Sequence, residues 1–143
     1  IPEAGELHHV SVVVPSIAAS LPFYRDTLGM RPGPVREIAD QGVRAVFLSA
    51  PNALIELIEP TDPRSGVARF LAERGKPTLH HLCYVVDDLR GTLAALADRG
   101  VELIDREPRR GAEGDVAFLH PRASGGVLVE LIDRASLERP HTS

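Results

Sequence analysis

Two histidines and two glutamates hold matched places in the two halves of this chain of 143 residues. His9 and His81 each precede an apolar run, whereas Glu56 and Glu130 each interrupt a later one. Taken singly, either glutamate fits the solvent-facing side of a half-exposed strand. Two carboxylates amid apolar residues are costly to bury unless they are paired or bind a metal. Together with two imidazoles they suit a borderline divalent cation, with water or substrate oxygens completing six-fold coordination.

Each of these histidines is the second of a His-His pair. Successive strand residues point to opposite faces, so only one member of each pair can face an interior. We favour His9 and His81, and expect His8 and His80 to face outward or to support the ligands. The favoured histidines are in phase with small or apolar residues: His9 with Ser11 and Val13, His81 with Cys83 and Val85.

The chain repeats itself after about half its length. Leu-His-His-Val at 7–10 returns as Leu-His-His-Leu at 79–82, and Ile-Glu-Leu-Ile-Glu at 55–59 returns as Val-Glu-Leu-Ile-Asp at 129–133. The string Val-Glu-Leu-Ile-Asp-Arg also occurs at 101–106. The spacing of the repeat selects Glu130 over Glu102, which we expect to be a solvated side chain of the strand after the second helix.

Apolar residues spaced three and four apart predict one amphipathic helix in each half. The first runs from the capping residue Ser16 to Gly29, and the second from Asp87 or Asp88 to Gly100. Phe23 and Tyr24 lie at helical spacing and are expected in the core, as is Phe118.

Strand pairs then end each half, so that each half reads β-α-β-β-β. We expect an α+β fold and one globular domain overall. Its parts are a first module at 1–60, a linker at 61–76 with a short helix from Val67 to Arg74, a second module at 77–134 and a tail at 135–143, with His141 in a stretch without pattern.

Composition narrows the function classes. A chain that is 43% hydrophobic and 25% charged is too apolar for disorder. A net charge of -4 without a basic stripe argues against nucleic-acid binding. No apolar stretch reaches the roughly 20 residues that span a bilayer, so we expect no membrane partner. A single cysteine, Cys83, and an N-terminus without signal-peptide features predict a cytoplasmic protein.

The repeated motifs resemble the vicinal oxygen chelate (glyoxalase/bleomycin resistance/dioxygenase) superfamily, and within it the methylmalonyl-CoA epimerase family. The resemblance extends from Leu7 to about Ile132. Its more particular stretches are Gln-Gly-Val at 41–43, Phe-Leu-His-Pro at 118–121 and Gly-Gly-Val-Leu-Val-Glu-Leu at 125–131.

The resemblance implies paired βαβββ modules that form a curled, cup-shaped mixed sheet around one divalent ion. It implies His9, Glu56, His81 and Glu130 as ligands of cobalt, or of another first-row ion such as manganese, nickel or zinc. It also implies epimerisation of methylmalonyl-CoA through a metal-stabilised enolate, with Glu130 as a base.

A second base is less clear. Some family members carry a glutamate four residues after the glutamine of Gln-Gly-Val, where this chain has Ala45. Glu37, Asp40 or Glu59 are alternatives, and the sequence selects none of them.

For the acyl-CoA substrate, we expect contacts from His120, Arg109 and Arg110, with Arg106 nearby. Each has an alternative structural interpretation, as a strand cap for His120 and as a solvated turn for the arginines. A homodimer is expected. Two other functions stay open: another enzyme of the superfamily, such as a glyoxalase-type isomerase or lyase, and a metal-free small-molecule binding module of the antibiotic-resistance type.

Overall fold

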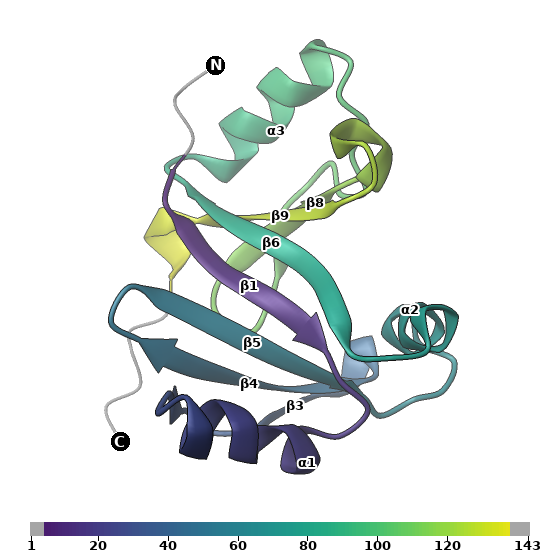
Figure 1. Cartoon of the computed structure of the whole chain (residues 1–143). Helices are drawn as coiled ribbons and strands as arrows, with labels where there is room; N and C mark the ends of the chain where they lie inside the picture. Colours follow the sequence, from purple (N-terminus) through teal and green to yellow (C-terminus); the bar gives the residue numbers. More distant parts are fainter. Residues whose placement is uncertain (1–4, 138–143) are drawn as a thin grey trace. The chain divides into compact units, whose positions relative to one another are not determined.

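The computed structural model describes residues 5–137, so part of the expected tail, His141 included, lies outside the described residues. Backbone contacts divide the described chain into two compact units. Module N comprises His9–His80, and module C comprises residues 5–8 together with residues 81–137; a strand that crosses this division is described with the module that holds most of its residues. Figure 1 labels the α-helices and most of the strands of both.

Module N has a mixed sheet in the order β2-β4-β5-β1, with β3 also pairing with β4. β1 runs parallel to β5, and the other pairs are antiparallel. Its strands are β1 (Leu7–Val13), β2 (Arg31–Pro32), β3 (Arg36–Ile38), β4 (Val43–Ala50) and β5 (Ala53–Pro60). Its helices are α1 (Ile17–Leu21), a π-helix (Pro22–Thr27), a 3-10 turn (Ala39–Gln41) and α2 (Gly66–Arg74).

Module C repeats this plan in the order β6-β9-β8-β7, with its first strand again parallel to its last. Its strands are β6 (Thr78–Val86), β7 (Arg109–Arg110), β8 (Asp115–Leu119) and β9 (Leu128–Asp133). Its helices are α3 (Leu89–Asp98) and two 3-10 turns (Pro121–Ser124 and Arg134–Ser136). The predicted α+β class is confirmed. Module C has the predicted β-α-β-β-β order, and module N differs from it by one short strand, because β2 and β3 both pair with β4.

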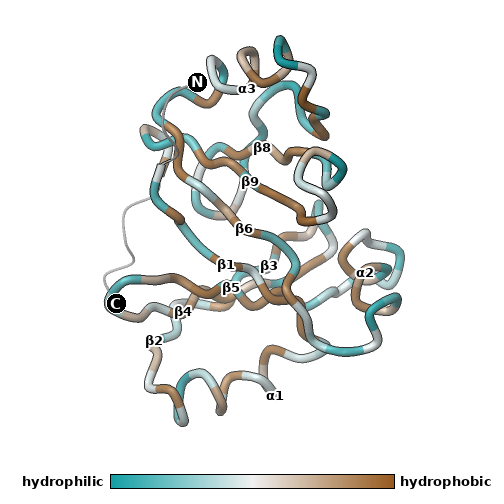
Figure 2. The backbone as a smooth tube through the Cα atoms, turned by 45° about the horizontal axis from the view of Figure 1, so that its top comes forward, coloured by the Kyte–Doolittle hydropathy of each residue, from teal (hydrophilic) through white to brown (hydrophobic). Residues whose placement is uncertain are grey.

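One face of each sheet packs on the helix of its own module. The buried clusters on this helix face are Val14, Ile17, Val46, Leu48 and Leu57 in module N, and Leu89, Leu93, Ala117 and Leu131 in module C. Figure 2 shows the corresponding hydrophobic stretches along β5 and β9. Since strand residues alternate, the other face of each sheet carries a different set of side chains. We call it the site face, because His9 and Glu56, or His81 and Glu130, point to it.

Acidic side chains tie each helix to the last strand of its module. The Ile17 backbone N–H donates to Glu59 Oε1 at 2.7 Å, and the Leu89 N–H donates to Asp133 Oδ1 at 3.1 Å. Glu59 and Asp133 each follow the proposed ligand of their strand by three positions, and therefore point to the helix face. The two acidic residues of each last strand therefore point to opposite faces of its sheet.

The first helix departs from the prediction. α1 ends at Leu21 and continues as a π-helix from Pro22 to Thr27, in which the Leu28 N–H donates to the Phe23 carbonyl at 3.0 Å. Proline has no backbone N–H, so the regular ladder cannot continue through it. The side chain of Phe23 is 55% exposed, so its expected place in the core is wrong, whereas Tyr24 packs on the buried cluster.

The short helix predicted from Val67 to Arg74 is present as α2. α2 begins after the capping residue Ser65 and ends at Gly75, whose φ of 71° is left-handed and favours glycine. No helix within residues 5–137 combines the length and apolarity needed to cross a bilayer.

Candidate functional site

Module N brings the first predicted pair together. His9 of β1 and Glu56 of β5 lie on the site face, with His9 Nε2 3.6 Å from Glu56 Oε1. In the parallel register Ser11 pairs with Glu56, and His9 lies two residues before Ser11 on the same face. His9 is 4% and Glu56 7% exposed. A carboxyl group and an imidazole ring thus lie beside each other with little access to water.

Module C builds the same arrangement from β6 and β9. His81 Nε2 lies 3.3 Å from Glu130 Oε1, and both side chains are buried. Here the register pairs Cys83 with Glu130, so Cys83 occupies the place that Ser11 has in module N. The choice of the second histidine of each pair therefore agrees with the burial of both rings.

Two phenylalanines complete these pairs, and sequence reasoning missed their role. The Phe47 ring meets His9 edge to face at 5.1 Å between centroids, and Phe118 meets His81 in the same way at 5.5 Å. Phe47 is the register partner of Glu56 across β4 and β5, as Phe118 is of Glu130 across β8 and β9. Such aromatic contacts fix ring orientation. Phe118 is half-buried on the site face. The occurrence of a phenylalanine at the matching place in each half was the sequence signal that could have revealed this role.

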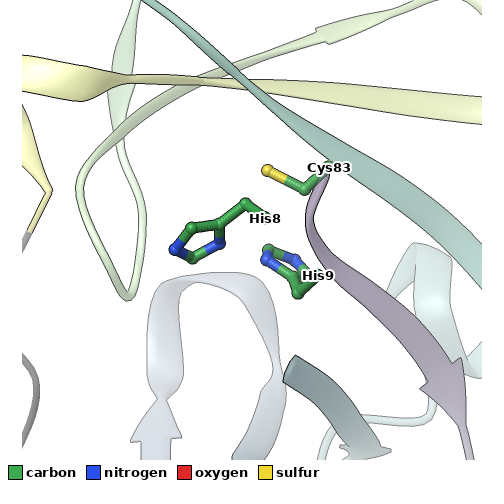
Figure 3. Close-up of side chains that lie close together, drawn as sticks. All are labelled: His8, His9 and Cys83. Carbon is green, nitrogen blue, oxygen red and sulfur yellow. The ribbon is translucent and has the colours of Figure 1, made fainter. Parts of the chain in front are cut away.

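The first histidine of each pair has other neighbours. Within module N, the His80 ring packs edge to face on Phe70 of α2 at 4.9 Å. Within module C, a ring nitrogen of His8 lies within 4.8 Å of Cys83 Sγ (Figure 3). Both rings are half-buried, in contrast to His9 and His81.

Ala45 lies on the site face of β4 and is 2% exposed. Two of the acids considered in its stead are bound elsewhere: Arg44 Nε donates to Glu37 Oε1 at 2.9 Å, and Arg44 Nη1 donates to Glu59 Oε2 at 2.7 Å. Arg44 precedes Ala45 in the strand and points to the helix face. Glu37 and Glu59 therefore lie away from the site face, whereas Asp40 belongs to the exposed 3-10 turn before β4.

Of the predicted substrate contacts, Arg109 is linked through Phe118 to the His81–Glu130 pair of module C. Its guanidinium carbon lies 5.2 Å from the centre of the Phe118 ring, whose edge meets His81. Arg109 Nη2 also pairs with Asp105 Oδ2 at 3.2 Å, and the arginine side chain is 47% exposed. A partly exposed cation thus lies one ring away from His81.

His120 and Arg110 have local partners. His120 Nδ1 accepts from the Arg122 backbone N–H at 3.1 Å and caps the 3-10 turn at Pro121–Ser124. Its Nε2 lies 3.6 Å from Glu102 Oε2. Arg110 Nη1 lies 3.6 Å from Asp115 Oδ1. Glu102 is exposed as expected, but residues 101–103 form one isolated bridge, Leu103 to Leu119, instead of a strand.

Electrostatics around Glu102 follow from its arginine partner. Arg122 Nη2 donates to Glu102 Oε2 at 2.6 Å, and this hydrogen bond holds the pKa of the carboxyl below its usual value. Glu102 is thus paired with an arginine at the surface, whereas Glu130, in an identical stretch of sequence, is buried beside His81.

Each module thus supplies one imidazole nitrogen and one carboxylate on its site face. Imidazole nitrogens and carboxylate oxygens are donors that borderline divalent cations accept. A carboxylate can also act as a general base that removes a proton from a carbon beside a carbonyl group, and a bound cation would stabilise the charge that develops on the carbonyl oxygen.

Comparison with known proteins gives consistent results. The model of the Glyoxalase/Bleomycin resistance protein/Dioxygenase superfamily matches residues 8–118. An ethylmalonyl-CoA/methylmalonyl-CoA epimerase of Cereibacter sphaeroides is 39% identical over 129 residues, 89% of this chain and 96% of that protein.

Two solved structures are also similar. The methylmalonyl-CoA epimerase of Mycobacterium tuberculosis is 36% identical with a TM-score of 0.83, covering 89% of this chain and 86% of that chain. A methylmalonyl-CoA epimerase in complex with methylmalonyl-CoA and NH4+ is 31% identical with a TM-score of 0.85, covering 96% of this chain and 100% of that chain. The resemblance drawn from the sequence motifs is confirmed.

Proposed function

Because this chain belongs to the Glyoxalase/Bleomycin resistance protein/Dioxygenase superfamily and its relatives include methylmalonyl-CoA epimerases, we propose that it epimerises methylmalonyl-CoA. The observation that carries the proposal is the duplicated buried His–Glu pair, one in each module. A binding module without a metal has no need of two buried carboxylates, each beside an imidazole.

We propose that His9, Glu56, His81 and Glu130 together bind one divalent ion, cobalt or another first-row ion such as manganese, nickel or zinc. The donor types fit such an ion. The four residues are only 4–8% exposed, so little water competes with the ion for their donor atoms. When bound, the ion supplies positive charge that stabilises the enolate oxygen.

Epimerisation breaks the C–H bond of the carbon between the thioester and the carboxylate. We assign Glu130 to take up this proton, while the electron pair passes into the thioester carbonyl. Returning a proton to the opposite face of the same carbon completes the reaction. Ala45 cannot do this, and Glu37 and Glu59 bind Arg44 on the helix face. Glu37 and Glu59 are thus not the second acid.

The anionic groups of an acyl-CoA require cations. Arg109 is half-exposed and stacked on Phe118, so we propose that it binds a carboxylate or phosphate of the substrate. Arg110 and His120 have weaker support, because their described contacts lie within their own loops. We also propose a cytoplasmic homodimer, for which light scattering should give twice the 15.5 kDa of one chain.

Deuterium exchange tests the activity directly. The protein is incubated with (2S)-methylmalonyl-CoA in deuterated water, and mass spectrometry follows the acyl group against a protein-free control. We expect one deuterium at the α-carbon at a rate far above the control. Exchange no faster than in the control would refute the epimerase assignment, whatever the metal content of the protein.

A further inference from the structure

Ser11 is a polar residue that the proposed reaction has not used. It lies on the site face of β1, two residues after His9, and its side chain is completely buried. Within residues 5–137, Ser11 Oγ is the one buried side-chain oxygen or nitrogen with no hydrogen-bond partner. Leaving a buried hydroxyl unpaired costs free energy, so such a group calls for an explanation.

The strand register indicates which group the hydroxyl serves. Ser11 and Glu56 are direct partners across the parallel strands β1 and β5, so their side chains leave the same face of the sheet. Adjacent strands are about 5 Å apart, within the combined reach of a serine and a glutamate side chain. Glu56 Oε1 now lies 3.6 Å from His9 Nε2, a separation too long for a good hydrogen bond.

We propose that Ser11 is a positioning residue for Glu56. When Glu56 turns one oxygen to a bound divalent cation, Ser11 donates its hydroxyl hydrogen to the other oxygen. Carboxylates that bind metals are themselves held by hydrogen bonds from groups around the site, and losing such a partner weakens metal binding. This inference rests on the proposed metal site.

Module C provides an internal comparison. Cys83 pairs with Glu130 as Ser11 pairs with Glu56, and Cys83 is also completely buried. A thiol is a much weaker donor than a hydroxyl. The two carboxylates therefore differ in the hydrogen-bond donor beside them, and the strong donor belongs to Glu56.

The proposal predicts that the Ser11 hydroxyl lowers the stability of the metal-free protein and strengthens metal binding. Both effects can be measured. Removing the hydroxyl takes away an unpaired buried group from the metal-free protein, so Ser11→Ala should raise the Tm without metal by about 2–5 °C. The same variant should bind cobalt(II) about tenfold more weakly. A residue that only fills space would lower the Tm when truncated and would leave the cobalt affinity unchanged.

The experiment measures Tm by calorimetry after chelation, and cobalt(II) affinity by isothermal titration of the full chain. Ser11→Cys replaces the hydroxyl with a weak donor of similar shape and should weaken cobalt binding almost as much as Ser11→Ala. Cys83→Ala is the matched control, expected to lower the Tm through a cavity and to keep cobalt affinity within about twofold.

The outcomes separate this inference from the proposed function. If the unmutated protein binds no cobalt, the metal site and the role of Ser11 both fail. If it binds cobalt and Ser11→Ala keeps the affinity within about twofold, only the role of Ser11 fails. A Tm that falls in metal-free Ser11→Ala also contradicts the proposal, because it means that the hydroxyl already stabilises the metal-free protein.

Discussion

Glu130 and Glu102 lie in identical stretches of six residues and have opposite surroundings. Glu130 is buried beside His81, whereas Glu102 is exposed and bound to Arg122. The proposed proton transfer requires the first carboxylate and makes no use of the second. Replacing each with glutamine therefore gives a matched pair of variants.

We expect Glu130→Gln to lower kcat by about 10²–10⁴-fold, the usual contribution of a general base. Glu102→Gln should keep kcat within about twofold. Steady-state epimerase assays measure both, and circular dichroism confirms that each variant is folded. Full turnover by Glu130→Gln would remove Glu130 from the role of base.

The pKa of Glu102 gives a prediction at the same scale. Arg122 holds this pKa below its ordinary value, first through the side-chain hydrogen bond. A lowered folded-state pKa stabilises the fold above the ordinary pKa of a glutamate, and this stabilisation is lost as the pH falls through the folded value. Arg122→Ala should raise the Glu102 pKa toward its ordinary value in an NMR titration of the carboxyl carbon. An unchanged pKa would contradict the assigned cause.

At the scale of elements, the last strand of each module both presents a site glutamate and caps a helix. Glu59 accepts from the first backbone N–H of α1, in addition to binding Arg44. Helix caps of this kind contribute about 1 kcal/mol. Glu59→Ala removes this acceptor and should therefore lower the Tm by a few degrees.

Glu37→Ala is the control for this variant, since Glu37 of β3 also accepts a hydrogen bond from Arg44. Calorimetry should show a smaller loss for Glu37→Ala. Equal losses in the two variants would mean that the arginine contact, and not the cap, accounts for the effect of Glu59.

Sequence periodicity predicted the elements well wherever a side-chain pattern repeats. The amphipathic α3 and the strand around Glu130 follow their patterns, because burial on one face determines both. The π-helix after Leu21 was missed, since apolar spacing does not register the missing N–H of Pro22. The contact of Phe47 with His9 was missed as well, because it depends on the pairing of β4 with β5 rather than on local spacing.

At the scale of the whole molecule, the proposed metal site links ion binding to folding. A cation that binds only the folded chain stabilises it by about 2.7 kcal/mol at a concentration 100 times its Kd. Cobalt(II) should therefore raise the Tm of the chelated protein by several degrees, and EDTA should reverse the gain. His81→Ala is expected to abolish this response, and an unchanged Tm on addition of cobalt would contradict the proposed metal site.

Module C is built from both ends of the described chain. The Val85 backbone N–H donates to the Glu6 carbonyl at 2.9 Å, and Arg134 Nη2 pairs with Glu6 Oε2 at 2.8 Å. Module N is continuous from His9 to His80. A ribosome therefore synthesises every residue of module N before residues 81–137 of module C, although residues 5–8 are made before module N. Since domains fold as units during synthesis, the middle of this chain can fold first, while residues 5–8 wait for the last strands to be made.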